Sequence, residues 1–97
     1  MNSNFIPGSM KAYVYILKSL KNSRFYIGST DNLNRRIDEH NSGKSTYTSF
    51  SKPFELVFSQ EYDELTMARK IEYWLKRQKD KKLIERIITE KKIQKTF

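Results

Sequence analysis

The sequence has 97 residues, no cysteine and a formal net charge of +8. A chain of this length predicts one domain with a single core, and the missing thiols exclude a disulfide scaffold, a cysteine zinc site and a cysteine nucleophile. The positive charge favours a polyanionic partner, most commonly nucleic acid, although an anionic membrane surface or a ribosome would also satisfy it.

The first nine residues differ from the rest of the chain. Residues 1–9, MNSNFIPGS, have no charge and no periodicity and directly precede a second methionine, so we expect a cloning remnant followed by one domain over residues 10–97. We find no secretory leader pattern, and no apolar run approaches the roughly 18 to 20 residues that span a bilayer. These features predict a cytoplasmic protein without a membrane segment.

Two short strands are expected next. The alternation in AYVYILKS, residues 12–19, puts Tyr15 on one face and Ile16 on the other, and both faces are apolar enough to be buried. Residues 20–24 supply turn residues, and FYIGS, residues 25–29, follows as a second strand. A hairpin is the simplest interpretation.

A short helix and a third strand follow the hairpin. Thr30 or Asp31 is expected to cap a helix over residues 32–40, which ends before Gly43. A polar loop leads to a strand over residues 54–62, which we expect near an edge of the sheet. Alternation places three apolar side chains on its buried face: Phe54, Leu56 and Phe58.

The rest of the chain has helical periodicity. Asp63 is expected to cap a long helix with an apolar stripe formed by Leu65, Ala68, Ile71 and Leu75. Asp80 is expected to cap a last amphipathic helix, whose apolar face is formed by Leu83, Ile84, Ile87 and Ile88. The prediction is an α+β fold in the order ββαβαα, with a small three-stranded antiparallel sheet flanked by helices.

Several polar side chains fall on faces that this arrangement buries. Helical spacing puts His40 near the centre of the buried face of the first helix and Arg36 beside it, where a guanidinium needs a carboxylate or a phosphate. Glu72 lies close to the apolar stripe of the long helix and needs a cation, either a divalent metal or Arg36. Tyr15 and Tyr26, on paired strands, are expected to project toward the same place.

Two short motifs lie on the two predicted strands, Tyr13-Val14-Tyr15 on the first and Tyr26-Ile27-Gly28 on the second. With them the sequence resembles the GIY-YIG nuclease family, whose second motif is intact here and whose first motif has tyrosine in place of its glycine. The similarity extends over roughly residues 12 to 88, and its order and spacing match the small stand-alone members, which are related to the N-terminal nuclease domain of a repair excinuclease.

The resemblance implies a function and a set of roles. It implies a DNA endonuclease of repair or processing that hydrolyses phosphodiester bonds with Mg²⁺ or Mn²⁺, with Glu72 holding the metal and Arg36 stabilising transition-state charge. Tyr15 or Tyr26 would deprotonate or orient the water, and the role of His40 is left open. Ser29 stands where the excinuclease branch has lysine, so one phosphate contact is expected to be missing.

Further DNA contacts are expected around this site, with cleavage that is structure-selective or nonspecific because no separate reading domain is present. The candidates are Lys44, Tyr47, Thr48, Lys76 and Arg77. RNA is the less favoured substrate, and the sequence does not give the oligomeric state.

Other interpretations remain open. The chain is alternatively a non-catalytic nucleic-acid-binding module with the same fold, or an interaction protein for an acidic partner. The two tyrosines are alternatively core aromatics, His40 a structural residue, and Glu72 and Arg36 a static ion pair.

Overall fold

The computed structural model describes residues 11–44 and 46–95, and within these the order of elements is the predicted ββαβαα. The segment expected to be a cloning remnant, residues 1–9, lies outside the described residues. Among the described helices, none has the length and apolar character needed to cross a membrane. The elements are β1 (Ala12–Ser19), β2 (Phe25–Thr30), α1 (Leu33–Asn41), the 3-10 helix η1 (Thr46–Ser51), β3 (Phe54–Tyr62), α2 (Leu65–Gln78) and α3 (Lys81–Glu90).

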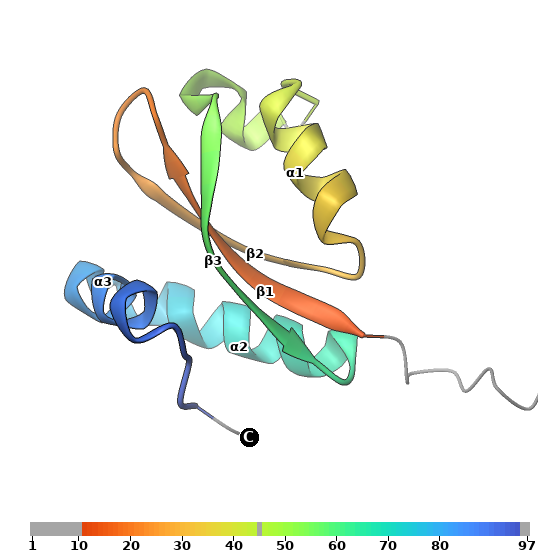
Figure 1. The fold of residues 1–97 in the computed structure, drawn as a ribbon, viewed down its shortest axis with the longest axis vertical. Coiled ribbons are helices and arrows are strands. Elements are labelled where there is room, and N and C mark those ends of the chain that lie inside the picture. The colour runs from red at the N-terminus through yellow and green to blue at the C-terminus, as the bar shows by residue number, and fades with distance from the viewer. Residues whose placement is uncertain (1–10, 45, 96–97) are drawn as a thin grey trace, which may run out of the picture.

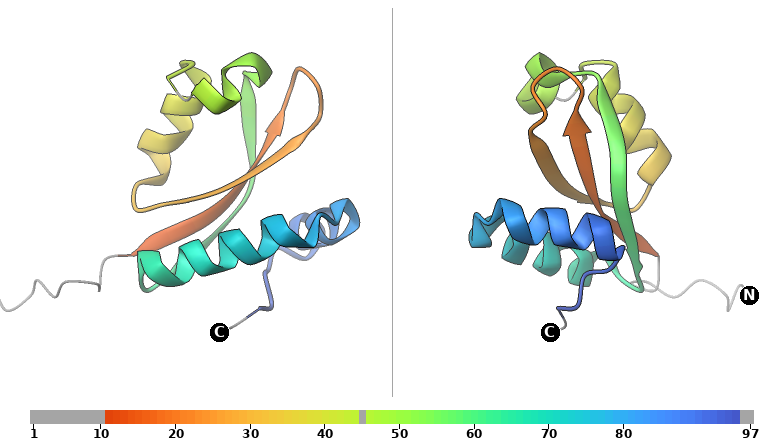
Figure 2. Two further views of the ribbon diagram at one scale, coloured as in Figure 1. Left: turned by 180° about the vertical axis from the view of Figure 1, so that it is seen from behind. Right: turned by 60° about the vertical axis from the view of Figure 1, so that its left-hand side comes forward.

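The described strands form one antiparallel sheet in the order β2-β1-β3, so the two outer strands are edges, as predicted for β3. The hairpin register sets Tyr15 opposite Gly28. Figures 1 and 2 show α1 and η1 against one face of the sheet and α2 with α3 against the other. The sheet is therefore the middle layer between two groups of helices.

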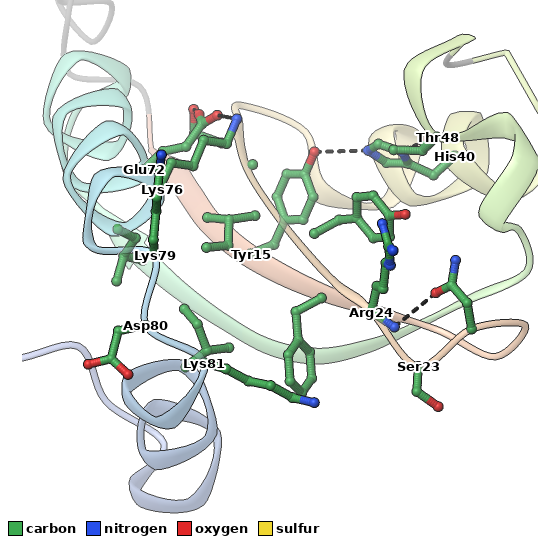
Figure 3. Close-up of a pocket in the computed structure, with 18 of the residues that line it drawn as sticks. Tyr15, Ser23, Arg24, His40, Thr48, Glu72, Lys76, Lys79, Asp80 and Lys81 are labelled. Carbon is green, nitrogen blue, oxygen red and sulfur yellow. Dashed lines mark hydrogen bonds and ion pairs between the residues drawn. The ribbon is translucent and has the colours of Figure 1, made fainter.

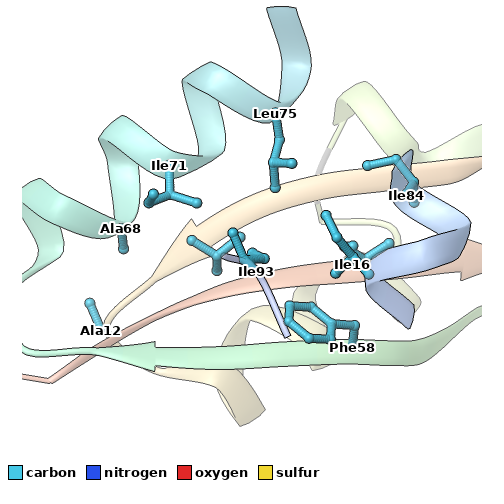
Figure 4. Close-up of a cluster of buried hydrophobic side chains, with 10 residues drawn as sticks. Ala12, Ile16, Phe58, Ala68, Ile71, Leu75, Ile84 and Ile93 are labelled. Atoms are coloured by element: carbon cyan, nitrogen blue, oxygen red, sulfur yellow. The ribbon is translucent and has the colours of Figure 1, made fainter. Parts of the chain in front are cut away.

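Strand β1 supplies both faces of the sheet with core residues, which confirms the prediction that it is buried on both sides. Val14 and Ile16 belong to the larger core, which lies under α2 and α3 and is shown in Figure 4. Tyr15 and Leu17 belong to a smaller core with Phe54 under α1. Each face thus anchors its helices to the same central strand, which fixes the two helix groups relative to each other.

The predicted alternation of β3 is wrong in its middle. The register shifts between Ile16 and Leu17, which lie opposite Phe58 and Leu56, so one extra residue of β3 bulges out of the ladder. A bulge exchanges the faces of the residues on its two sides. Phe58 consequently packs in the larger core and Phe54 in the smaller one, whereas Leu56 is exposed.

The helix caps correct two further predictions. Asn32, rather than Thr30 or Asp31, caps α1 by accepting a hydrogen bond from the backbone N–H of Arg35. Helix α2 begins after Glu64 and has no side-chain cap, and Asp63 instead pairs with Lys11. A 3-10 helix interrupts the expected polar loop.

The predicted N-terminal cap of α3 and the predicted glycine after the end of α1 are confirmed. Asp80 caps α3 by accepting from the backbone N–H of Leu83. Gly43, just past the end of α1, has a φ of 82°, the left-handed conformation that favours glycine there.

Candidate active site

A cleft of about 1010 Å³ runs along the edge strand β2. Its walls come from opposite sides of the sheet, with α1 and η1 on one side and α2 and the start of α3 on the other (Figure 3). Most of the predicted site residues line this cleft: Tyr15, Tyr26, Arg36, His40, Thr48, Glu72 and Lys76. Residues far apart in the sequence are thus brought together in one cleft.

The phenol of Tyr15 lies directly over Gly28. A Cβ atom built on Gly28 would stand 2.2 Å from the Tyr15 hydroxyl oxygen and 2.4 Å from Cζ, far inside van der Waals contact. The ring belongs to the smaller core and is only 3% exposed, so it has little room to move away. The glycine of the Tyr26-Ile27-Gly28 motif is therefore required by the tyrosine on the neighbouring strand.

A hydrogen-bonded chain leads from this phenol into the protein. The Tyr15 hydroxyl lies 3.0 Å from Nε2 of His40, and Nδ1 of His40 lies 2.7 Å from the hydroxyl of Thr48. His40 and Thr48 are 5% and 2% exposed. Both ring nitrogens of the imidazole are therefore engaged, and its orientation is fixed from two sides.

The environment keeps these groups neutral. Burial raises the pKa of Tyr15, and the Arg36 guanidinium beside the phenol partly offsets that effect. Burial also lowers the pKa of His40, and the positive charge of Arg36 lowers it further. A neutral imidazole has one N–H donor and one acceptor nitrogen, so it accepts a proton at one nitrogen while the other stays hydrogen-bonded.

Tyr26 is held differently. Its hydroxyl lies 2.7 Å from that of Ser51 in η1, and its ring packs edge-on against Phe54, with the centroids 5.3 Å apart. Tyr15 and Tyr26 do project to the same face of the sheet, as expected, yet their hydroxyls bind different partners. Ser51 was not a candidate in the sequence, because nothing in an irregular polar loop indicates which hydroxyl will turn inward.

Arg36 binds a carboxylate of its own helix. Its Nη1 lies 2.9 Å from Oε1 of Glu39, one helical turn away, and this pair raises the pKa of Arg36 and lowers that of Glu39. The alternative of a static ion pair between Arg36 and Glu72 is not borne out, because Arg36 pairs with Glu39 and Glu72 pairs with Lys76. Both side chains of the observed pair between Arg36 and Glu39 are about one-third exposed and Arg36 lines the cleft, so the guanidinium can exchange the carboxylate for another anion at low cost.

Glu72 stands on the opposite wall. Its Oε2 accepts from Nζ of Lys76 at 2.6 Å, and its Oε1 accepts from the hydroxyl of Ser29 at 2.5 Å. Ser29 was expected only as a lost phosphate contact. Strand alternation turns it toward α2, whereas its neighbour Gly28 faces the Tyr15 side, and this spacing is the sequence signal that would have assigned it to Glu72.

One carboxylate is enough for one kind of metal site. In residues 11–44 and 46–95, no three carboxylate, imidazole or thiol side chains cluster to hold a metal. Mg²⁺ usually takes one or two protein carboxylates and completes its shell with water and substrate phosphates. Glu72, at a cleft wall with its side chain 20% exposed, suits that mode once Lys76 leaves Oε2.

The other predicted nucleic-acid contacts are dispersed. Lys44 is exposed and Arg77 lies over the ring of Tyr73, and neither lines the cleft. The side chain of Tyr47 lies outside the described part of the chain. The cleft also has basic residues that the sequence prediction missed, because their proximity depends on how the β1–β2 hairpin lies relative to the corner between α2 and α3: Arg24, Lys79 and Lys81.

Comparisons with a family model and with curated proteins show which family this chain resembles. The model of the GIY-YIG catalytic domain matches residues 11–85. Among curated relatives, the UPF0213 protein SSP2268 of Staphylococcus saprophyticus is 38% identical over 78 residues, which cover 76% of this chain and 94% of that protein. The UPF0213 protein YazA of Bacillus subtilis is 36% identical over 71 residues, with 72% and 71% of the two chains covered.

The fold is found again in a solved structure. The solution NMR structure of the UPF0213 protein BH0048 from Bacillus halodurans is similar with a TM-score of 0.54 and 35% sequence identity. The similarity covers 84% of this chain and 86% of that one.

Proposed function

Because the chain belongs to the GIY-YIG family of nuclease catalytic domains, we propose that it is a metal-dependent endonuclease that hydrolyses phosphodiester bonds in DNA. The observation that carries the proposal is that one cleft is lined by both motif tyrosines, Arg36, His40 and Glu72. This set combines a fixed proton acceptor, a cation for phosphate and a carboxylate for a metal.

Arg36 is proposed to hold the scissile phosphate. Its guanidinium has donors only, and the phosphate of a substrate would compete with Glu39 for them. The position beside Tyr15 brings the bound phosphate close to the proposed base. Positive charge there stabilises the extra negative charge that develops on the phosphoryl oxygens in the transition state.

Tyr15 and His40 are proposed to act as a proton relay. Arg36 offers only donors to the phenol oxygen, so the hydroxyl proton of Tyr15 points to Nε2 of neutral His40. A water proton passes to the Tyr15 oxygen while the phenol proton passes to Nε2. The hydroxide attacks phosphorus, the bond to the leaving sugar oxygen breaks, and that oxygen takes a proton from solvent.

Thr48 supports this relay. Its hydroxyl lies 2.7 Å from Nδ1 of His40, and by accepting from Nδ1–H it would select the tautomer whose Nε2 is free to accept. We therefore assign Thr48 to the positioning of His40 in preference to direct contact with DNA. Tyr26, whose hydroxyl is engaged with Ser51, is assigned to shaping the cleft and orienting the water.

Glu72 is proposed to hold Mg²⁺ or Mn²⁺, with Ser29 keeping the carboxylate in place. When bound, such an ion neutralises charge on the phosphate and at the leaving oxygen. Lys76 releases Oε2 and becomes available to a neighbouring phosphate. Glu72 and Lys76 are both partly exposed at the cleft wall, so Glu72 can exchange the ammonium group of Lys76 for a metal ion.

A non-catalytic DNA-binding module is the second candidate. The ion pair between Lys76 and Glu72 favours it, because a carboxylate whose charge is satisfied within its own helix needs no metal. The two candidates differ in whether Glu72 is required for turnover or only for local stability.

Cleavage assays separate the candidates. End-labelled single-stranded, duplex and branched DNA are incubated with the protein in Mg²⁺, Mn²⁺ or EDTA, together with Glu72→Gln and the control Glu61→Gln, whose carboxylate pairs with Lys11 away from the cleft. We expect metal-dependent cleavage that falls about 100-fold or more in Glu72→Gln and is unchanged in Glu61→Gln. Binding of DNA without cleavage by any of the three proteins would establish the module instead.

A further inference from the structure

Two large apolar side chains are exposed on neighbouring segments, the β1–β2 hairpin and η1; the hairpin also supplies lining residues of the cleft such as Arg24. Phe50 in η1 is 82% exposed and Leu20 in the β1–β2 hairpin is 62% exposed. Figures 1 and 2 show η1 beside the hairpin, and Nζ of Lys21 donates to the backbone carbonyl of Phe50 at 3.0 Å. We call this pair, Leu20 and Phe50, the apolar platform.

The platform is fixed to the cleft through the residue after Phe50. Ser51 is buried, its carbonyl accepts from the hydroxyl of Ser19 at 2.6 Å, and its own hydroxyl lies 3.1 Å from Nδ2 of Asn22 and 2.7 Å from the hydroxyl of Tyr26. Phe50 is therefore exposed on a segment that hydrogen bonds hold in place. It directly precedes Ser51, whose hydroxyl contacts the motif residue Tyr26.

The charge around the platform points to an anionic ligand. Residues 19–24 and 46–53 contain no aspartate or glutamate, and they contain Lys21, Arg24 and Lys52. Arg24 also lines the cleft. A polyanion that enters the cleft is attracted along this end. A nucleic acid also carries the phosphate that the cleft is proposed to bind, which an acidic protein surface lacks.

An aromatic ring in such a setting fits a nucleobase. A base inside a duplex is stacked on both faces, so only an unpaired base has a face to offer, and every base can stack on phenylalanine regardless of sequence. Basic side chains beside the ring would follow the sugar-phosphate backbone on either side of that base.

We propose that Phe50, with Leu20 exposed on the adjoining hairpin, stacks on an unpaired base of the strand whose phosphate lies at Arg36, and so gives the protein a preference for single-stranded or extrahelical nucleotides. This inference rests on the proposed function for the identity of the ligand. It adds the structural class of the substrate and the side chain that selects it.

The test measures binding without cleavage. Affinities of the protein and of Phe50→Ala, Phe50→Trp and the control Tyr73→Ala are compared in EDTA for a fluorescent oligothymidine and for a duplex of the same length. Tyr73 is an exposed aromatic residue on α2, on the other side of the sheet. We expect Phe50→Ala to weaken single-strand binding about tenfold and duplex binding less than twofold, with Phe50→Trp at or above the original affinity and Tyr73→Ala unchanged.

An abasic site moved along the oligonucleotide then locates the contact. At one position, loss of the base should weaken binding by the original protein and have no further effect on Phe50→Ala. Equal losses for single strand and duplex, or no loss in Phe50→Ala, would overturn the inference. The binding test needs no turnover, so its result is independent of the cleavage assay. If the protein cuts DNA but Phe50→Ala binds single strands normally, only the role of the apolar platform is refuted. If the protein prefers single strands through Phe50 but does not cut, only the catalytic proposal is refuted.

Discussion

The two walls of the cleft are built on different physical principles. On the α1 side, the Tyr15, His40 and Thr48 chain is almost fully buried, neutral and hydrogen-bonded at each link. On the α2 side, Glu72 and Lys76 form an ion pair that is half exposed on its lysine. The buried wall can hold atoms in place but cannot change partners, whereas the exposed wall can exchange a lysine for a metal or a phosphate. Breaking each wall should therefore have different consequences.

The buried wall should be most sensitive at Gly28. Gly28→Ala puts a methyl group 2.2 Å from the Tyr15 hydroxyl, so the phenol or the strand must shift. We expect a loss of about 3 kcal/mol in the free energy of unfolding and loss of cleavage, since the phenol moves off His40. Urea unfolding measures the loss. The control is Gly43→Ala, where φ is strained but the neighbour is the flexible end of Lys52, at about 1 kcal/mol.

An equal or smaller cost for Gly28→Ala than for Gly43→Ala would show that the Tyr15 side relaxes easily. The rigidity assigned to the buried wall would then be wrong, and with it the physical reason for a glycine in the second motif.

The two tyrosines allow the same wall to be tested by removal of single atoms. Tyr15→Phe leaves the buried Nε2 of His40 without a partner, at about 1 to 3 kcal/mol, whereas Tyr26→Phe leaves Ser51 still bound to Asn22, at about 0.5 to 1.5 kcal/mol. Cleavage should fall about 100-fold or more in Tyr15→Phe and less in Tyr26→Phe.

Single-turnover rates at saturating protein make this comparison. If Tyr26→Phe abolishes cleavage and Tyr15→Phe retains it, the proton relay is assigned to the wrong strand, and the Tyr26 and Ser51 hydroxyls take its place.

The sequence predicted features that depend on one element and missed contacts between elements. Periodicity placed Tyr15 and His40 on buried faces and Glu72 beside an apolar stripe, because each depends only on the spacing within one element. Partners across elements were not predictable in this way. Thr48 and Ser51 come from a segment that was expected to be an irregular loop, and no local pattern indicates which of its hydroxyls turn inward.

The wrong prediction for β3 also has its cause in a contact between elements. Alternation in β3 failed at a bulge, which depends on pairing with β1 and leaves no mark in the local sequence. Arg36 was expected to need a carboxylate or a phosphate, and its partner is the carboxylate of Glu39, one turn away on its own helix, a local pair that helical spacing allows.

The protonation of His40 gives a further test of the buried wall, with a smaller expected effect on stability. It is the only histidine in the chain, so its NMR titration needs no assignment by mutation. We expect its pKa below 6.5, chiefly from burial, and Arg36→Gln should raise it part of the way by removing the second cause. Because the folded state then binds this proton less tightly than the unfolded state, the stabilisation is complete above pH 6.5 and is lost as pH falls from there through the lowered pKa.

Cleavage should follow the same group, declining as pH falls through the pKa measured for His40. A pKa at or above 6.5, or one that does not move in Arg36→Gln, would mean that solvent or Glu39 controls the imidazole instead of burial and the guanidinium.

The exposed wall should give the smallest change in stability and a gain in metal binding. Lys76→Met removes a partly exposed pair four residues apart, so the free energy of unfolding should change by less than about 0.5 kcal/mol. The same substitution frees Oε2 of Glu72 from its competitor, so Mn²⁺ should bind more tightly, as measured by water proton relaxation. Arg77→Met, which removes a cation from Tyr73 and leaves Glu72 alone, is the matched control. If Mn²⁺ binds equally to all three proteins, Lys76 and the metal do not share a site, and the exchangeable wall has to be sought elsewhere in the cleft.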